Sequence, residues 1–412
     1  MNFLHTISQK ISEKKPLPKL LNDIMESSKL IMDAEASSLL LYDPKDNKLH
    51  FQVATGEKGR LIKKISIDLG VGLAGWVAKH KKSILIDDCY KDKRFCSDYD
   101  KKSKFKTKSM ICVPLIRKNK LLGVIEVINR KDDGIFDERD LTIFETLASQ
   151  CAIAIENAQL IEIQIEKEAL ERELETARSI QQKLLPSDLP RFEDIQVAAK
   201  LIPAKQVGGD YYNMVKIDEN ESLFLVADVA GKGIPAALIV STIYSCLQTY
   251  LKLNLGEFDL MTFVNGLNKV LLESTTPDKF VSCWFGLYNH KKRKLKSINA
   301  GHNPTFVFKK GEDAPKKLET GGLFLGIFDQ VYEIEKIQLE SGNIFVFYSD
   351  GVTEAWNEKE QDYDERRLIN VVNQHIKMSA VDILTGIEKD VKNHVGKAQQ
   401  GDDFTCAVVK IL

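Results

Sequence analysis

The stretch between Phe136 and Pro186 constrains this chain more than any other feature, because it contains neither glycine nor proline. Its residues are mostly strong helix formers, and the stretch is longer than most globular helices. The sequence therefore predicts one long helix in the middle of the chain. We expect it to separate a first domain, residues 1–157, from a second, residues 187–412, with residues 158–186 as a helical linker.

Apolar residues in this predicted helix recur at spacings of three and four, as in the seam of a coiled coil. The first of them are Leu141, Phe144, Ala148, Cys151, Ile155 and Ala158. After Ile165 the apolar positions resume in a shifted phase, which would change the local winding of a paired helix. We expect a parallel homodimer through this linker. A solvated connecting helix is the alternative, because the charged stretch EKEALERELE suits either arrangement.

The first domain combines a helix with several short apolar runs. One face of the helix carries Leu20, Leu21, Ile24 and Met25. The runs SSLLLYD, LHFQVATG, KKISIDL, SILIDD, SMICVPLI and LLGVIEVIN are rich in aliphatic and β-branched residues and are broken by Gly, Pro, Asn or Asp. This pattern predicts an α+β domain built around a sheet.

The second domain is long enough for one sizeable α/β fold. Its predicted strands are SLFLVADV, VSCWFGLY, KLKSINA, PTFVFKK and NIFVFYSD, and its predicted helices lie around residues 235–253, 258–273 and 380–394. Several of these strands end in an acidic residue, which places carboxylates where strands meet loops.

Four motifs in this domain set aspartate beside glycine or a second aspartate at the end of an apolar run: VGGDYYN, LVADVAGKG, FYSDGVTEA and GDDFTCAVV. A single Asp-Gly pair usually marks a turn. Four carboxylates at strand ends can instead converge on one edge of a sheet, and hard divalent cations bind several oxygen ligands. The sequence therefore predicts a Mg²⁺ or Mn²⁺ site formed by Asp210, Asp228, Asp350 and Asp402.

Other kinds of chemistry lack their usual motifs. The chain has no HExxH, CxxC, GxxxxGK[ST] or GxSxG sequence, so neither a zinc site nor a phosphate loop nor a serine nucleophile is indicated. Activation of water by two divalent cations remains, and this chemistry hydrolyses phosphate esters. The seven scattered cysteines are expected to be core residues.

The charge balance and hydropathy give no reason to expect nucleic acid or a membrane as partner. Acidic and basic residues nearly cancel, with a formal net charge of -1. The N-terminal sequence MNFLHTISQKISEKK lacks the apolar stretch of a signal peptide, and we expected no apolar run able to span a bilayer. These features favour a cytoplasmic protein.

Seven motifs in order, ARSIQQKLLPSDLP, GGDYYN, DVAGKGIPAAL, NAGHNPTFVF, LGIF, FYSDGVTEA and GDDFTCAVV, resemble the RsbU/SpoIIE-type branch of the metal-dependent protein phosphatases (PPM family). The resemblance implies an α-β-β-α sandwich and two bound Mn²⁺ or Mg²⁺ ions. It implies that the ligands are Asp210, Asp228 with the carbonyl of Val229, Asp350 and Asp402, with Asp403 as a further ligand or a supporting residue. It also implies that the substrate is a phosphoserine or phosphothreonine on a bacterial regulator such as a STAS-type anti-sigma-factor antagonist.

One position departs from the family pattern, which reads GGDxxD where this chain has Asn213. An amide offers an oxygen but no charge, so metal affinity should fall if this position touches a metal. The alternative function is accordingly a weak or inactive phosphatase fold that binds a phosphoprotein as a scaffold. His302, in NAGHNP, could be a turn residue or lie near the phosphate, and Lys232 and Lys205 are both candidates for anchoring the substrate.

The first domain resembles a GAF domain over nearly its whole length, through AEASSLLLYD, LGVIEVINRKDDGIFDERDL and ASQCAIAIENAQL. The resemblance implies a sensor that binds a small molecule or a protein partner, and we expect it to regulate the phosphatase. Its GxGxxG sequence, from Gly70 to Gly75, is a weak match to a dinucleotide site because KKISID reads as an exposed strand. Asn129, Arg130, Phe136 and Asp140 partly match the NKFDE pattern of cyclic-nucleotide-binding GAF domains, and we interpret them as fold-supporting. The effector is not indicated.

Overall fold

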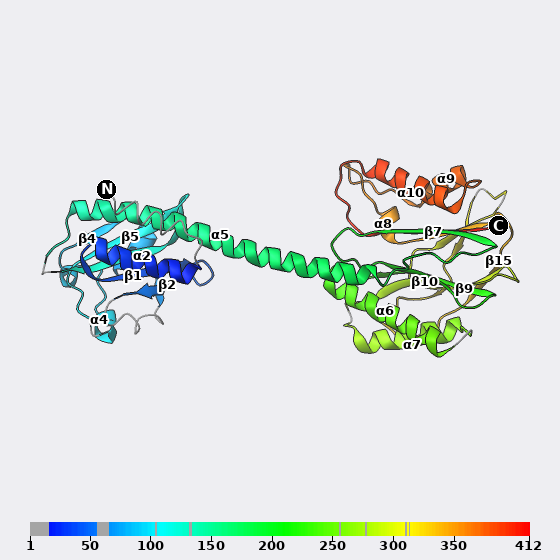
Figure 1. The fold of residues 1–412 in the computed structure, drawn as a ribbon, viewed down its shortest axis with the longest axis horizontal. Helices are drawn as coiled ribbons and strands as arrows, with labels where there is room; N and C mark the ends of the chain where they lie inside the picture. The colour runs from blue at the N-terminus through cyan, green and yellow to red at the C-terminus, as the bar shows by residue number, and fades with distance from the viewer. Residues whose placement is uncertain are drawn as a thin grey trace. The chain divides into compact units, whose positions relative to one another are not determined.

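The computed structural model describes residues 16–55, 66–103, 105–131, 134–254, 257–276, 278–309, 311–312 and 314–412. The N-terminal sequence that was considered as a signal peptide lies outside these residues. The chain divides into two compact units, residues 1–169 and 170–412, and the division lies inside the long central helix (Figure 1).

The N-terminal unit is built on a six-stranded sheet with the order β3-β2-β1-β6-β5-β4. Its strands are β1 (Ala34–Asp43), β2 (Lys48–Ala54), β3 (Ser66–Asp68), β4 (Ile84–Ile86), β5 (Met110–Arg117) and β6 (Lys120–Arg130). Every pair of neighbours is antiparallel. These strands coincide with the apolar runs in the sequence, so the predicted sheet is confirmed.

Helices cover both faces of this sheet. Its helices are α2 (Leu17–Ile31), α3 (Gly72–His80), the short 3₁₀ helix η2 (Cys89–Lys91) and α4 (Asp98–Ser103). On one face, α2 and the first turns of α5 (Glu138–Gln182) form a core with β1, β5 and β6. On the other face, α3 covers a second core that contains Leu40, Leu73 and Val77. Alternation of side chains along each strand supplies both cores.

The central helix α5 confirms the long helix predicted from the absence of glycine and proline. The first part of its predicted coiled-coil seam is wrong, because Phe144, Ala148, Cys151 and Ile155 are buried in the core of the N-terminal unit. A helix that packs on a sheet shows the same spacing of three and four as a helix that packs on a partner. Beyond this core, apolar residues of α5 are exposed, and the homodimer stays a prediction for that part. They are Leu160, Ile161, Ile163, Ile165 and Leu170.

The C-terminal unit contains two sheets packed face to face. The first has the order β14-β11-β10-β9-β8, with β15 also paired to β11, and the second has the order β13-β12-β16-β17-β7. The strands are β7 (Ile195–Ile202), β8 (Tyr211–Lys216), β9 (Glu221–Val229), β10 (Val281–Asn289), β11 (Lys294–Ala300), β12 (Thr305–Phe308), β13 (Lys316–Leu318), β14 (Gly321–Gly322), β15 (Glu335–Gln338), β16 (Ile344–Tyr348) and β17 (Phe404–Ile411).

Helices cover the outer faces of both sheets, which gives the four-layer α-β-β-α order seen in Figure 1. The helices are α6 (Ile234–Leu253), α7 (Leu260–Ser274), α8 (Asp350–Thr353), α9 (Glu365–His375) and α10 (Ala380–Val395). The inter-sheet core contains Phe224, Trp284 and Phe345. The predicted sandwich is therefore present.

Helix α6 corrects one expectation from the sequence. Among the described residues it is the one helix long and apolar enough, by length and composition, to cross a membrane. Ala236, Val240, Ile243 and Leu247 are nevertheless buried in the core between this helix and the first sheet. A helix in a protein core and a membrane span share this composition, so the run carries no separate indication of a membrane.

Candidate metal centre

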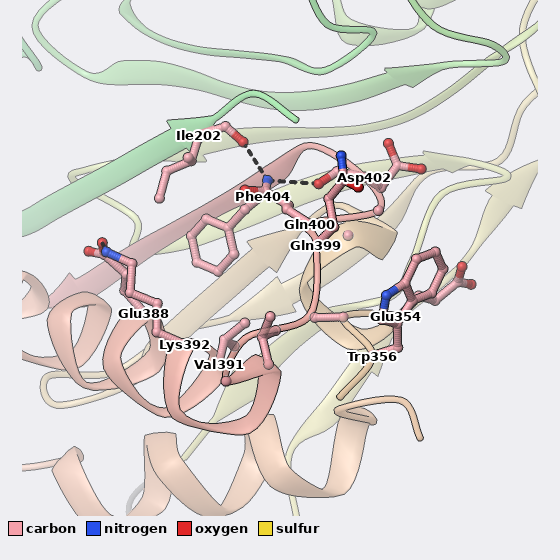
Figure 2. Close-up of a pocket in the computed structure, with 15 residues that line it drawn as sticks. Ile202, Glu354, Trp356, Glu388, Val391, Lys392, Gln399, Gln400, Asp402 and Phe404 are labelled. Atoms are coloured by element: carbon pink, nitrogen blue, oxygen red, sulfur yellow. Dashed lines mark hydrogen bonds and ion pairs between the residues drawn. The ribbon is translucent and has the colours of Figure 1, made fainter. Parts of the chain in front are cut away.

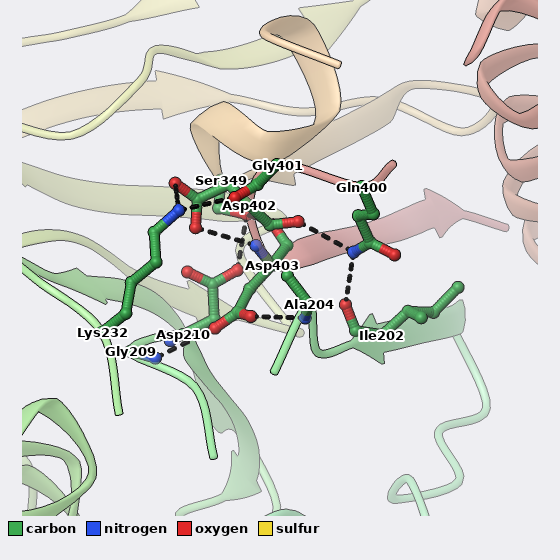
Figure 3. Close-up of polar contacts among 10 residues, drawn as sticks. All are labelled: Ile202, Ala204, Gly209, Asp210, Lys232, Ser349, Gln400, Gly401, Asp402 and Asp403. Carbon is green, nitrogen blue, oxygen red and sulfur yellow. Dashed lines mark hydrogen bonds and ion pairs between the residues drawn. The ribbon is translucent and has the colours of Figure 1, made fainter. Parts of the chain in front are cut away.

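The aspartates of the four motifs come from elements that end at the same edge of the sandwich. Asp210 immediately precedes β8, Asp228 is the penultimate residue of β9, Asp350 is the first residue of α8 after β16, and Asp402 and Asp403 immediately precede β17. Val226, which shares a strand face with Asp228, belongs to the inter-sheet core, so the Asp228 side chain lies on the side that faces the second sheet. The structure thus brings the predicted carboxylates close enough to affect one another's pKa values. Figure 3 shows Asp210, Asp402 and Asp403 of this cluster.

Asp210 is the most enclosed of these residues, at 4% exposure. Its Oδ2 accepts hydrogen bonds from the Ser349 hydroxyl, at 2.6 Å, and from the Thr405 hydroxyl. Burial and the nearby charges of Asp228 and Asp403 raise the pKa of Asp210 well above its ordinary value. The two hydroxyls thus hold one oxygen of the Asp210 carboxylate in place.

Asp403 binds the backbone of the loop that carries Asp210. Its Oδ1 accepts from the amide of Ala204 at 2.8 Å, and its Oδ2 accepts from the amides of Gly209 at 2.9 Å and Asp210 at 3.4 Å (Figure 3). A side chain at residue 208 would collide with Oδ2 of Asp403, so the glycine there permits this approach. Asp403 is therefore placed to support Asp210.

The carbonyl of Val229, the predicted backbone ligand, faces the same loop. A Cβ at Gly209 would lie 2.8 Å from this carbonyl oxygen and 3.4 Å from Oδ1 of Asp228. The Gly209 carbonyl in turn accepts from the Val229 amide at 3.2 Å. The second glycine of GGD therefore allows the Asp210 loop and the end of β9 to approach closely.

The aspartates of the cluster are partly buried and lie close enough to affect one another's pKa values. Burial, followed by the charges of Asp350, Asp402 and Asp403, raises the pKa of Asp228 to about 7. Burial, followed by the charges of Asp402 and Glu354, raises the pKa of Asp350 to about 6. Carboxylates crowded in this way are stabilised by a divalent cation, and an all-oxygen donor set suits Mg²⁺ or Mn²⁺. The residues present thus fit the predicted metals.

Lys232 supplies a positive charge at the rim of the cluster. Its Nζ lies 2.8 Å from Oδ2 of Asp402 and donates to the Gly401 carbonyl at 2.6 Å. Partial burial acts to lower the pKa of Lys232, but the hydrogen bond and charge of Asp402 outweigh it and raise that pKa. Lys205, the other candidate, is exposed in the loop between β7 and β8. Of the two, Lys232 is the one that contacts the carboxylates.

Asn213 is buried on the opposite face of its sheet from Asp228. It pairs in register with Leu225, which faces the helices α6 and α7, and its Nδ2 donates to the Tyr211 hydroxyl at 2.6 Å. The departure from GGDxxD therefore lies on the helix-covered side of the sheet, with its amide engaged by a tyrosine.

His302 is buried and holds neighbouring segments together. Its Nδ1 lies 2.7 Å from the Ser282 hydroxyl, and its Nε2 lies 3.0 Å from the Tyr348 carbonyl. Burial lowers the pKa of His302 to about 4, so the ring is neutral at physiological pH and Nε2 donates to that carbonyl. This geometry supports the structural alternative for His302, which steadies the chain just before Ser349 and Asp350.

Three supporting residues were not singled out from the sequence. Two of them lie inside recognised motifs, Ser349 in FYSDGVTEA and Thr405 in GDDFTCAVV, so their position near an aspartate in these motifs was the available signal. Gln181, near the end of α5, exchanges two hydrogen bonds with Gly208: its Nε2 donates to the carbonyl at 2.8 Å and its Oε1 accepts from the amide at 3.1 Å. The long helix thereby binds the backbone next to Asp210 directly.

The NKFDE-like residues of the N-terminal unit support its fold. The Asn129 side chain accepts from the Lys108 amide at 2.7 Å and donates to the Lys106 carbonyl at 2.9 Å. Arg130 forms an ion pair with Asp140, which ties the end of β6 to the start of α5. These contacts are consistent with the fold-supporting interpretation.

Of the GxGxxG glycines, Gly70 lies in the turn after β3, Gly72 is the first residue of α3, and Gly75 lies inside this helix. Since β3 pairs antiparallel with β2, this segment does not belong to the parallel βαβ unit of a dinucleotide site. A Cβ at Gly75 would lie 2.5 Å from the Asp68 carbonyl oxygen, so close backbone packing explains this glycine. This arrangement argues against a dinucleotide site, which the sequence matched only weakly.

Comparison with known proteins assigns each unit to a family. Residues 218–412 match the family described as Stage II sporulation protein E (SpoIIE), and residues 14–156 match the GAF domain family. Phosphoserine phosphatase RsbU of Bacillus subtilis is 32% identical over 247 residues, and the match covers 59% of this chain and 71% of RsbU. Protein IcfG of Synechocystis is 26% identical over 262 residues, but the match spans only 41% of IcfG and 58% of this chain.

The C-terminal fold also has a solved counterpart. The SiaA-PP2C domain of Pseudomonas aeruginosa superposes with a TM-score of 0.52 at 19% identity, covering 60% of this chain and 99% of that domain. At this identity the likeness shows the fold alone. Together with the family matches, it confirms the two predicted domain types.

Proposed function

Because the chain belongs to the RsbU/SpoIIE family of PP2C-type protein serine/threonine phosphatases, which are metal-dependent, we propose how its own residues perform that reaction. We assign two Mg²⁺ or Mn²⁺ ions to Asp210, Asp228, the carbonyl of Val229, Asp350 and Asp402. The observation that carries this proposal is the convergence of these carboxylates, where burial, followed by the charges of neighbouring aspartates, raises the pKa values of Asp228 and Asp350.

The divalent ions would supply an acidified water nucleophile and charge stabilisation at phosphorus. The protein contributes the geometry. Ser349 and Thr405 fix Oδ2 of Asp210, so that Oδ1 would be the oxygen that binds an ion, and Asp403 holds the Asp210 loop through three backbone amides. Lys232 is placed to pair with a substrate phosphate beside Asp402.

The proposed substrate is a phosphoserine or phosphothreonine on a bacterial regulatory protein, such as a STAS-type anti-sigma-factor antagonist. The support is the RsbU relative, which carries the name phosphoserine phosphatase. Phosphate release from a panel of purified phosphoproteins would identify the individual regulator.

Regulation by the GAF domain is proposed to reach the site through α5. The first turns of this helix, including Phe144, lie in the core of the N-terminal unit, and Gln181 in its last turn contacts Gly208. A rotation or shift of its C-terminal turns would move the loop that carries Asp210. Such a helix with two alternative positions provides the two-state element that allosteric coupling needs.

The deciding experiment is hydrolysis of a phosphoserine protein and of p-nitrophenyl phosphate with Mn²⁺, with EDTA as one control. We expect Asp350→Ala to remove activity, whereas Asp329→Ala, at an exposed acid of the same domain, should retain it. Activity that survived both EDTA and Asp350→Ala would overturn the metal mechanism. Phosphoprotein binding without hydrolysis under every condition would instead support the scaffold alternative.

A further inference from the structure

A cavity of about 390 Å³ adjoins the candidate metal centre on the outer side of the second sheet. It lies between α10, the loop that follows α8, and the segment that leads into β17 (Figure 2). Its lining includes Gly351, next to the proposed ligand Asp350, and Asp402 itself. A molecule held in this pocket would therefore lie beside Asp402, a proposed metal ligand.

The interior of the pocket is apolar and its charges lie at two ends. Apolar surface comes from Ile202, Ala355, Val391, Val395 and Phe404. At one end, the Glu388 carboxylate lies 2.7 Å from Lys200 and 2.6 Å from Lys392, so its charge is paired. At the other end lies Glu354, whose negative charge contributes to the raised pKa of Asp350. A large apolar group suits this pocket better than a charged one.

Trp356 joins the pocket to the catalytic edge. Its indole is 46% exposed, and a Cβ at Gly401 would lie only 2.6 Å from Cη2, so the ring packs directly on the backbone before Asp402. The Gln400 side chain fixes the same segment by donating to the carbonyls of Ile202 at 3.0 Å and Asp402 at 2.8 Å. Figure 2 shows Trp356 across the pocket from Val391 and Lys392.

We propose that this pocket, which we call the Trp356 pocket, binds an apolar side chain of the phosphoprotein substrate close to the phosphoserine. The inference rests on the proposed function and adds a determinant of substrate choice to it. An extended peptide advances about 3.3 Å per residue, so a leucine or phenylalanine two or three positions from the phosphoserine reaches the pocket while the phosphate lies at the aspartates. Continuity of the pocket with Asp402 favours a substrate side chain over a separate effector.

The test uses the full-length protein with Mn²⁺ and phosphoserine peptides of one sequence, in which each flanking position carries Leu, Phe or Ala. We expect kcat/KM to be about tenfold higher for Leu or Phe than for Ala at one position, as for a single apolar group in a pocket. Trp356→Ala and the pocket-filling Val395→Phe should each bring this ratio close to one. Val381→Phe adds the same ring to an exposed position of α10 and should leave the ratio unchanged.

Equal kcat/KM for all peptides, or a Leu preference that survives both pocket variants, would overturn the inference while leaving the phosphatase proposal intact. If neither the peptides nor p-nitrophenyl phosphate is hydrolysed, the proposed function fails on its own. In that case, the same peptides are labelled with fluorescein, and their affinity for the protein is measured by fluorescence polarisation to test whether the Trp356 pocket binds an apolar side chain. A Leu-over-Ala affinity ratio that Trp356→Ala removes supports it, and a ratio of one refutes it.

Discussion

The Ser349 hydroxyl lies 2.6 Å from Oδ2 of Asp210, so the residue directly before one proposed ligand, Asp350, positions another that is distant in sequence. The same hydroxyl also accepts from the Thr405 amide at 3.2 Å. This single side chain therefore joins the ends of β16, β17 and β8 at the candidate metal centre. Removal of this hydroxyl should leave the Asp210 carboxylate less firmly positioned at the candidate metal centre.

Ser349→Ala is expected to weaken Mn²⁺ binding about tenfold, in the range seen when a residue that orients a ligand is lost. Isothermal titration calorimetry of Mn²⁺ binding measures the effect. Ser341→Ala, at an exposed position just before β16, is the matched control and should bind Mn²⁺ as the wild type does. Wild-type affinity in Ser349→Ala would show that Asp210 needs no orienting hydroxyl.

Gln181→Ala should reduce Mn²⁺ affinity and kcat by about fivefold or more. Coupling between two sites of a protein typically changes ligand affinity by at least about fivefold. Both hydrogen bonds to Gly208 are lost, and the Asp210 loop loses its contact with α5. The adjacent Gln182→Ala, at an exposed position, controls for general effects on the helix. Equal kinetics in the two variants would argue against a role for α5 in setting the site.

Without metal, the stability of the protein should fall as pH rises from about 4 to about 7, the interval between the ordinary and the raised aspartate pKa values. Asp228, with a pKa of about 7, and Asp350, with a pKa of about 6, hold protons more tightly in the folded state than the ordinary aspartate value of 3.8 allows. A raised carboxyl pKa stabilises the fold below that pKa, and the contribution is lost as pH passes through it. Melting temperatures across this range, with EDTA, measure the trend.

Asp228→Asn removes one of these titrating groups and should flatten the pH dependence. Saturating Mg²⁺ should have the opposite effect to EDTA and stabilise the protein most at high pH, where the carboxylates are ionised. A metal-free protein that became more stable with rising pH would contradict the assignment of these raised pKa values.

Asn213→Asp, which restores the usual family residue, should change Mn²⁺ affinity by less than about twofold, since the side chain faces α6 and α7 and bonds to Tyr211. A buried carboxylate there should instead destabilise the fold by about 1–3 kcal/mol. Calorimetric Mn²⁺ binding and urea unfolding measure the two quantities. A large gain in affinity would mean that position 213 reaches the metals.

The sequence was sufficient for the central helix, the N-terminal strands and the four Asp-containing motifs, because these are local signals, but it did not predict β7, β8 or α9. The sequence does not show what an apolar helix face packs against. Phe144 and Ile155 were therefore predicted to contact a second helix, whereas they pack on the sheet of their own unit. Gln181 was not predicted as a supporting residue, because a side-chain amide that binds backbone groups produces no recognisable sequence motif. The orientation of Asn213 required the register of β8, which sequence alone does not provide.

The double use of α5 restricts how such proteins can exchange their sensors. Residues up to Ile155 complete the hydrophobic core of the GAF unit, whereas Gln181 belongs to the phosphatase. A gene fusion joined upstream of Ile155 would remove apolar residues of α5 from the core that this helix shares with α2 and the sheet, and the exposed core would favour aggregation. Fusion points that yield active hybrid proteins should therefore lie between Ala158 and Arg178. Insertions in this range that rotate the helix by part of a turn should change phosphatase activity more than insertions of whole turns.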